Sequence, residues 1–498
     1  MPLMPLDIPA GVYKNGTDIQ AAGRWRDASL VRWMDGTMRP MHGWRVRSES
    51  GSFAPVRGMI SWTDNTGSRY YAGGTYNNLY VWNGTNDRFQ TINSPALTTG
   101  FSDAQANLGY GGGLYGRQTY GDPRSNDGSG RIIPATTWAL QTWGQYLLNC
   151  NDFDGIVREW QLGVGNPDNV QVVNAPINNT SIVVTEERFL MCLGAEGNVR
   201  LVKWSDREDN TVWDPTAENE AGEIELSTEG VILSGVSVQG QTLILTTRDA
   251  FAGNYIGPPY VYGFERVGTG CGLAASLAYA STDNGCFWMG NHSFYAYAGG
   301  KVTQLQCSVS DYVFSDINRS QISKSWAMPM DEHGEAWFFY PSSGSNECNR
   351  YVVYNYVENT WYTGNLSRSA GCDSGPFEYP MMADPEDYLI YEHEVGFAYT
   401  GSDLPFAETG PIALGDGEQV MSVTKLIPDE KTNGDVLATF KTRFTPNGTE
   451  RTYGPFTMAD PVSMRFTGRQ VRMRIEGTRA TDWRSGINRL GYAVGGKR

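Results

Sequence analysis

Short runs of alternating apolar and polar residues, separated by polar turns, recur along the middle four hundred residues of the chain. Residues 283–297 read Asp-Asn-Gly, then Cys-Phe-Trp-Met-Gly, then a second turn and Ser-Phe-Tyr-Ala-Tyr. Residues 151–160 follow the same plan and end on Trp160. A period of two is typical of strands with one buried face, and Asn-Gly or Asp-Gly pairs favour type I′ turns. Each unit is therefore expected to form a β-hairpin.

Seven such units lie between residues 55 and 400, and most of them end roughly 40 to 60 residues apart. One unit cannot cover its own apolar face, so units of this kind stack side by side or close into a ring. The pattern predicts an all-β fold whose body, residues 55–400, is a β-propeller of six or seven blades. Arrays of β-sandwiches would give similar spacings. The units are residues 59–82, 138–160, 181–204, 231–255, 275–297, 325–361 and 381–399.

The first 54 residues form an N-terminal segment that we expect to dock on this body. Residues 23–44 alternate on both sides of Asp35 and Gly36, a pair suited to a two-residue hairpin turn. Three tryptophans in this stretch supply large apolar side chains. The segment is therefore predicted to be a hairpin that packs against later strands.

Residues 401–498 carry longer alternating strands than the body does. In the stretch 470–476, Val471, Met473 and Ile475 fall on one face of a strand, and two arginines and a glutamate fall on the other. The pattern predicts a separate antiparallel β-sandwich-like domain with an exposed cationic face.

Two segments depart from the strand pattern. Residues 96–134 are rich in Gly and Tyr and do not alternate, which favours an extended loop inserted between blades. Residues 315–325 are predicted to form one short helix with Ser315 as its N-cap.

The composition fits short strands and tight turns. The 498 residues include 59 Gly, 27 Tyr, 19 Phe and 15 Trp, and only 19% are charged. The net charge of −15 is unevenly distributed: residues 1–57 carry +3, residues 461–498 carry +7, and the remainder carries −25. An acidic body repels nucleic acid at long range, whereas basic ends can pair with an acidic neighbour or a second copy.

The seven cysteines contain no C-x-x-C pair and have no metal-ligand spacing, so we expect mostly buried free thiols. No run of eighteen apolar residues occurs, and no basic stretch followed by an apolar one opens the chain. These features indicate a soluble protein made in a reducing compartment. The N-x-S/T sequences at Asn15, Asn83 and Asn447 coincide with Asn-Gly pairs and are interpreted as turns.

No catalytic residue, cofactor site or metal site is predicted. The four histidines, His42, His292, His333 and His393, are far apart in the sequence and have no cysteine or carboxylate at ligand spacing, so we interpret them as structural. Residues 151–155 lack the distal Glu of a calcium loop and are better explained as a hairpin turn.

The alternative to a structural role is a propeller glycosidase or lectin-like protein acting on bacterial surface polysaccharide. Residues 281–288 are similar to the Asp box of propeller glycosidases, with Phe287 in place of its Thr, but that box stabilises a turn and is not an active site. A glycosidase also needs two carboxylates, or a Tyr nucleophile, across a central pocket. The sequence singles out no such pair.

Two groups of residues are candidate interaction sites. Arginines and tryptophans at both ends of the chain are assigned to a subunit interface, because docking on an acidic neighbour suits an acidic protein better than DNA binding does. The interface candidates are Arg24, Trp25, Arg32, Trp33, Arg465, Arg469, Arg472 and Arg474. Candidates for a tip or gate in the inserted loop are Tyr110, Tyr115, Arg117 and Tyr120.

Taken together, the hairpin, the aromatic blades and the arginine-bearing last domain resemble the tail nozzle proteins (tail hub, or tail tubular B) of short-tailed bacteriophages, the podoviruses. The likeness covers most of the chain in texture and order, and no single diagnostic motif carries it. Residues 96–134 match nothing that can be transferred. The sequences that carry the resemblance are Leu-Val-Arg-Trp at 30–33, Met-Arg-Pro-Met-His-Gly-Trp at 38–44, residues 272–300 and 350–361, and Gly-Arg-Gln-Val-Arg-Met-Arg-Ile-Glu-Gly at 468–477.

The resemblance implies a structural virion protein, not an enzyme, assembled in the host bacterial cytoplasm and located in the virion tail. It implies a homohexameric ring below an adaptor (tail tubular A-like) ring, through which double-stranded genomic DNA passes during ejection without sequence-specific binding. Tail fibres or tailspikes and a tail needle or tip are further expected partners. A third hypothesis gives the Gly/Tyr-rich loop contact with the host surface. No cofactor is expected.

Overall fold

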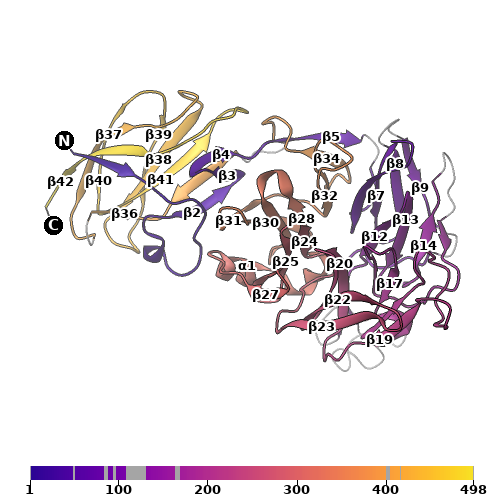
Figure 1. Ribbon diagram of the computed structural model, residues 1–498. Coiled ribbons are helices and arrows are strands. Elements are labelled where there is room, and N and C mark those ends of the chain that lie inside the picture. Colours follow the sequence, from indigo (N-terminus) through magenta and orange to yellow (C-terminus); the bar gives the residue numbers. More distant parts are fainter. Residues whose placement is uncertain are drawn as a thin grey trace, which may run out of the picture.

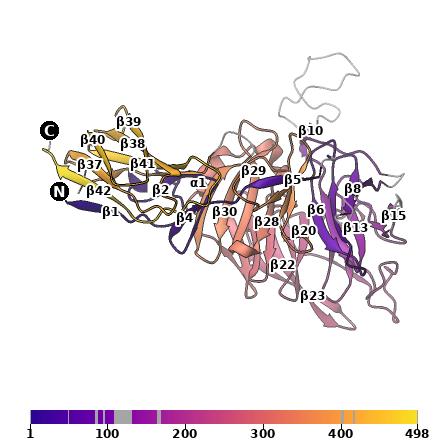
Figure 2. The same cartoon turned by 90° about the horizontal axis from the view of Figure 1, so that it is seen from above.

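The computed structural model describes residues 2–48, 51–83, 88–93, 97–107, 131–162, 169–399, 404–414 and 417–496. These residues build two β domains that lie end to end, a propeller and a sandwich (Figure 1). Both termini lie at the end of the sandwich that points away from the propeller, as Figure 2 also shows. The predicted all-β propeller with an appended antiparallel sandwich is confirmed.

Seven four-stranded antiparallel sheets in the described part of the chain form the propeller. The first four blades are β6 to β9 (Met59–Thr63, Arg69–Gly74, Leu79–Asn83, Arg88–Thr91), β12 to β15 (Trp138–Trp143, Tyr146–Asn151, Arg158–Trp160, Asn169–Gln171), β16 to β19 (Ser181–Val184, Leu190–Leu193, Leu201–Trp204, Gly222–Glu225) and β20 to β23 (Ile232–Val238, Gln241–Thr246, Asp249–Gly257, Val261–Thr269). The next two are β24 to β27 (Tyr279–Thr282, Gly285–Met289, Phe294–Ala298, Lys301–Gln304) and β28 to β31 (Trp326–Met330, Glu335–Pro341, Cys348–Asn355, Thr360–Asn365).

The seventh blade closes the ring with a strand from the other end of the chain. It consists of β32 (Ala370–Cys372), β33 (Met381–Ala383), β34 (Ile390–His393) and β5 (Trp44–Ser48). The outermost strand, β5, pairs with β34 in antiparallel register, and His393 lies opposite Trp44. The first strands of the seven blades contact one another in sequence order, and β32 returns to β6. The blade number, six or seven from the sequence, is therefore seven.

Large aromatic side chains fill the spaces within and between blades. Trp138 is 2% exposed, and its indole N–H donates to the carbonyl of Thr75 in the preceding blade at 2.7 Å. A Cβ at Gly74 would lie 2.3 Å from the Trp138 ring, so this approach needs a residue without a side chain. Removing one such ring from water contributes about 2–3 kcal/mol. Trp82, Trp160 and Trp204, which end three of the repeated units, are buried as well, so rings of this kind pack the propeller.

The sandwich joins both ends of the chain in two sheets. One sheet has the order β1 (Leu3–Leu6), β42 (Asn488–Val494), β37 (Met421–Ile427), β40 (Val462–Gly468). The other has the order β2 (Trp25–Ser29), β35 (Phe406–Thr409), β41 (Gln470–Gly477), β38 (Val436–Arg443), β39 (Arg451–Thr457), with β36 (Ile412–Ala413) also pairing β41. The alternation predicted for β41 is confirmed, because Val471, Met473 and Ile475 are buried.

The N-terminal segment is divided between the domains and is not one docked unit. Strands β1 and β2 belong to the sandwich, β5 belongs to the propeller, and β3 (Val31–Met34) and β4 (Thr37–Pro40) form a hairpin between them. Asp35 and Gly36 both have positive φ, 51° and 71°, as the predicted type I′ turn requires. The chain therefore connects the domains twice, once through this segment and once after β34.

The remaining elements are short. Helix α1 (Ser310–Asp316) begins five residues before the predicted start, with Val309 at its N-cap in place of Ser315. The second half of the predicted helix is the 3-10 helix η3 (Arg319–Lys324). Other single turns are η1 (Ile19–Ala21), η2 (Ala195–Gly197) and η4 (Asp331–His333). Strands β10 (Gln105–Asn107) and β11 (Arg131–Ile133) pair at the base of the expected loop. No helix among the described residues has the length and apolar character needed to cross a membrane.

Candidate functional site

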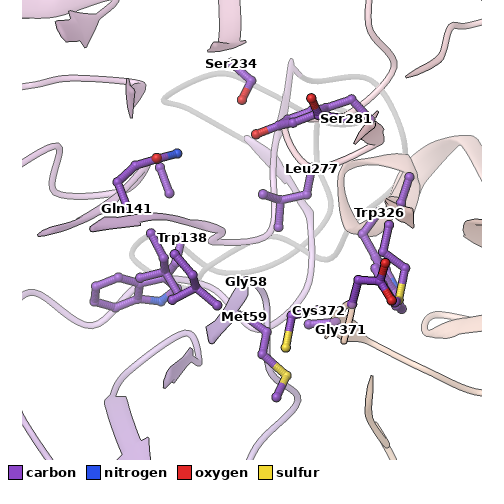
Figure 3. A pocket seen from close by; sticks show the side chains of 18 of the residues that line it. Gly58, Met59, Trp138, Gln141, Ser234, Leu277, Ser281, Trp326, Gly371 and Cys372 are labelled. Carbon is purple, nitrogen blue, oxygen red and sulfur yellow. The ribbon is translucent and has the colours of Figure 1, made fainter. Parts of the chain in front are cut away.

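The inner strands of the blades surround a cavity of about 320 Å³ near the propeller axis (Figure 3). Its wall combines rings and thioethers with small polar groups: Met59 and Trp138 lie on one side, Trp326 and Cys372 on another, and Ser281 across from them. These residues come from five of the seven blades. Side chains of this kind can hold a small neutral molecule or water.

Among the described residues that line this cavity, Asp373 is the one carboxylate. Burial raises the pKa of Asp373. Glycoside hydrolysis by paired carboxyl groups needs a second one across the sugar ring. The described wall therefore offers no pair of carboxylates for the glycosidase alternative. Tyr279 also lines the cavity, but burial raises the pKa of its phenol, which disfavours the ionised form that acts as a nucleophile.

The cysteines are free thiols with little reactivity. Five are buried and two, Cys307 and Cys372, are half-buried. Burial raises the pKa of Cys372, in the cavity wall, to about 12, so its thiol stays protonated near neutral pH. The expectation of mostly buried thiols is confirmed.

A second, polar cavity of about 510 Å³ lies between the sandwich and the sixth blade. Arg472 lies in its wall and donates to the carboxylates of Asp18 and Glu408. The Asp18 carboxylate also forms ion pairs with Arg443 and Arg26, with N–O distances of 3.1 and 3.3 Å. Although burial acts in the opposite direction, Arg472 and Arg443 hold the pKa of Asp18 below its usual value. The segment around η1 thus folds across the strand face that carries Arg472.

The other cations of this cleft also have partners within the chain. Lys441 pairs with Glu408 at 2.7 Å, and Lys14 pairs with Asp27 at 2.6 Å. The guanidinium of Arg474 lies 3.5 Å from the centre of the Phe406 ring. The predicted exposed cationic face is therefore largely covered, because acidic side chains of the N-terminal segment and of β35 neutralise it. These ion pairs join the N-terminal segment to the sandwich. Their contact with the propeller is made by Lys14, whose ammonium lies 4.0 Å from the centre of the Tyr312 ring on helix α1.

The structure separates the predicted interface residues into an inner and an outer group. Trp25, Arg32 and Trp33 are at most 6% exposed and lie in the interior of one chain, so they present no surface to a second copy. Arg472 and Arg474 belong to the cleft, and Arg469 is half-buried in the sandwich.

Two interface candidates remain at the surface. Arg24 is exposed and stacks on Tyr13, and Arg465 is exposed on β40. The tip or gate candidates lie outside the described residues; they are Tyr110, Tyr115, Arg117 and Tyr120.

The fold also builds a polar cluster that sequence reasoning missed. His42, His333 and Glu394, distant in the sequence, meet at the junction of the hairpin β3–β4 with the sixth and seventh blades. The Glu394 Oε2 atom lies 2.9 Å from His42 Nδ1 and 3.2 Å from His333 Nε2. The expectation that these histidines lack a carboxylate partner is therefore wrong. The three side chains meet because β5 closes the propeller, and this long-range pairing leaves no local signal in the sequence.

Arg32 is the cation of this cluster. It donates to both carboxylate oxygens of Glu394, at 2.7 and 2.8 Å, and its Nε lies 3.1 Å from Glu335. Burial acts against a charged guanidinium, yet the attraction of Glu335 and Glu394 raises the pKa of Arg32. The same guanidinium, with hydrogen bonds from both histidines, holds the pKa of Glu394 well below its usual value despite burial.

His393 plays a structural role in the interior of the seventh blade. His393 is buried against Trp44 and accepts a hydrogen bond from Arg368 Nε at 2.9 Å. Burial and the Arg368 charge lower the pKa of His393 well below its usual value, so the ring is neutral. His292 is exposed on the fifth blade.

No family model and no curated protein sequence matches this chain. Three solved structures illustrate what is found by shape. A chain of the mitotic checkpoint complex shares 9% identity at a TM-score of 0.41, covering 70% of this chain and 93% of that one. The Cps50 (Swd1) β-propeller domain of Myceliophteria thermophila shares 10% identity at 0.40, covering 72% and 99%. Dihydro-heme d1 dehydrogenase NirN shares 10% at 0.37, covering 82% and 79%.

Proposed function

We propose that this chain is a structural subunit of a homohexameric ring in the tail of a short-tailed bacteriophage, the nozzle through which double-stranded DNA leaves the particle. The observation that carries the proposal is the division of charge between the two domains. Residues 55–400 of the propeller carry 18 Lys and Arg against 38 Asp and Glu, a net charge of −20. Residues 1–29 and 401–498, which contain the strands of the sandwich, carry 17 Lys and Arg against 14 Asp and Glu, a net charge of +3.

A molecule with one acidic and one basic end favours head-to-tail association of identical copies. In a cyclic head-to-tail assembly, the basic face of each sandwich contacts the acidic face of the propeller in the next copy. Two different surfaces meet, so neither has to be complementary to a copy of itself. Such a ring closes only if every subunit holds the same shape. The two connections between the domains support that rigidity, and the ion pairs around Asp18 and Glu408 hold the N-terminal segment on the sandwich.

The acidity also suits a passage for DNA. Six copies carry about −90 at the chain's net charge of −15. A lumen lined by carboxylates makes few attractive contacts with phosphates, so DNA can slide through without being retained. The proposal assigns no reaction to the chain. An adaptor ring, fibres or spikes, and a tip are the partners it requires.

The test is the assembly state of the purified chain and its dependence on salt. Native mass spectrometry is expected to show a species of six 55.0 kDa chains at low ionic strength that dissociates as salt is added. Reversing two exposed charges, Arg24→Glu with Arg465→Glu, is expected to lower the salt concentration at which the ring dissociates. Lys301→Glu, an exposed charge reversal on the propeller, is the matched control and should leave the midpoint unchanged.

A monomer at every salt concentration, in the presence of the adaptor as well as alone, would contradict the proposal. So would an assembly that the paired reversal and the control weaken equally, because the sandwich charges would then have no specific role.

A further inference from the structure

We propose that His42, His333 and Glu394 form a binding site for a divalent transition-metal ion, with Zn²⁺ as the ion that best suits these donors. Two imidazole nitrogens and one carboxylate oxygen are a known zinc donor set, and they leave a fourth position for water. This inference stands independently of the proposed ring assembly.

The three donor atoms are already close to the spacing that an ion needs. All of them lie within 4.8 Å of one another, and the two nitrogens are 2.9 and 3.2 Å from the Glu394 oxygen. Ligands about 2.0–2.1 Å from a tetrahedral ion are roughly 3.4 Å apart. Small rotations of the three side chains are therefore enough to place an ion between them.

Hydrogen bonding alone does not satisfy the Glu394 carboxylate evenly. Its Oε2 atom faces three donors, from Arg32, His42 and His333, although one carboxylate oxygen has two lone-pair sites. If an ion binds, both imidazoles can turn lone pairs toward it. Arg32 still holds Oε1 at 2.8 Å and orients the carboxylate, as groups behind metal ligands commonly do.

The charge balance also favours a cation. Arg32 contributes one positive charge, whereas Glu335 and Glu394 contribute two negative ones, so the cluster carries −1 when both histidines are neutral. Glu335 is 0% exposed and Glu394 is 6% exposed. A buried negative charge without a counter-ion is costly and attracts a cation. A divalent ion would change the net charge of the cluster from −1 to +1, and a hydroxide on its fourth position would bring it to zero.

Backbone strain and access give two further observations. Glu394 has a φ of 62°, a left-handed conformation that a non-glycine residue adopts at a cost, and this directs its carboxylate into the cluster. His42 is 40% exposed, so an ion and its water can reach the site from solvent.

An ion here would connect three separate segments of the propeller. His42 precedes the closing strand β5, His333 lies in the turn between β28 and β29, and Glu394 follows β34. A metal bound by all three would tie the closing strand to the sixth and seventh blades. Because the three ligands come together only in the folded propeller, metal binding should raise the thermal stability of the chain.

The experiment uses the full chain without a polyhistidine tag, stripped with EDTA and exchanged into chelator-free buffer at pH 7.5. Calorimetric titration with ZnCl₂ is expected to show one ion per chain, and the melting temperature should rise with Zn²⁺. His42→Ala is expected to weaken binding at least 10-fold and to abolish the rise in melting temperature. His292→Ala, which removes an exposed histidine elsewhere on the propeller, is the matched control and should behave like the unmodified protein.

A second measurement needs no variant. Co²⁺ added to the stripped protein is expected to give the intense visible absorption of a four-coordinate site. The weak spectrum of hydrated Co²⁺ would overturn the proposal. Absence of Zn²⁺ binding, or binding that His42→Ala and His292→Ala reduce equally, would overturn it as well, and the cluster would then be an ion-pair network alone.

Discussion

Arg32 is the side chain whose loss should destabilise this protein most directly. Its guanidinium is 1% exposed and is the only Lys or Arg group that contacts Glu335 and Glu394 among the described residues. Arg32→Met keeps most of the apolar stem and removes the charge. Two buried carboxylates are then left without their counter-ion, and breaking a buried pair in this way costs about 3–5 kcal/mol of the free energy of unfolding.

The assay is urea unfolding in EDTA at pH 7, followed by tryptophan fluorescence. Arg248→Met is the control, because Arg248 and its partner Glu229 are 59% and 79% exposed and such pairs contribute about 0–1 kcal/mol. In a double-mutant cycle, Arg32→Met with Glu394→Gln should lose at least about 1 kcal/mol less than the sum of the single changes. A loss from Arg32→Met no larger than that from Arg248→Met would refute the reasoning.

Three other predictions concern the propeller. Burial raises the pKa of Asp152 to about 7, so the native state binds more protons than the unfolded state between about pH 4 and 7, and the free energy of unfolding falls as pH rises through that window. Asp152→Asn should therefore stabilise the protein by about 2 kcal/mol at pH 8 and by little at pH 4.5 in urea unfolding; equal effects at both pH values would contradict this. Gly155→Ala should cost about 2–4 kcal/mol, because φ is +61° and the new Cβ would lie 2.4 Å from the Asn179 backbone nitrogen. Gly144→Ala, at φ +64° with its nearest neighbour at 3.8 Å, should cost about 1 kcal/mol. Thermal denaturation that ranks the two variants alike would disprove the contact argument. Replacing residues 108–130 by a short Gly-Ser turn should preserve the melting temperature, because β10 and β11 already pair at the ends of that segment, while phage carrying the change should lose infectivity; normal infectivity would remove the proposed tip or gate role.

Local features of the fold could be predicted from the sequence. The seven repeated units correspond to the seven blades, and the alternation of β41 gives its buried face. Turn chemistry was equally reliable: Asn151 Oδ1 accepts hydrogen bonds from the backbone of Phe153 and Asp154, as expected for a hairpin turn and not for a calcium loop. Such features depend on neighbouring residues, which interact in any fold of the chain.

Long-range pairings could not be predicted in the same way. The strand that closes the ring, β5, pairs with β34 more than 340 residues later, and Arg472 meets Asp18 at a separation of 454 residues. Neither pair has a spacing or motif that identifies it. The cluster at Glu394 depends on the same closure, so its histidines looked isolated. The interface prediction failed for Trp25, Arg32 and Trp33 because large or charged side chains near a chain end can also be buried in the core of a single subunit.

The central claim is that an acidic propeller and a basic sandwich side assemble into a ring with a passage for DNA. Electron microscopy of the purified assembly, at a resolution that allows the two domains to be placed, tests it most directly. The account predicts a six-fold ring in which sandwich and propeller of adjacent copies meet and carboxylates line an open axial channel. Particles without six-fold symmetry, or a channel lined by lysine and arginine, would contradict it.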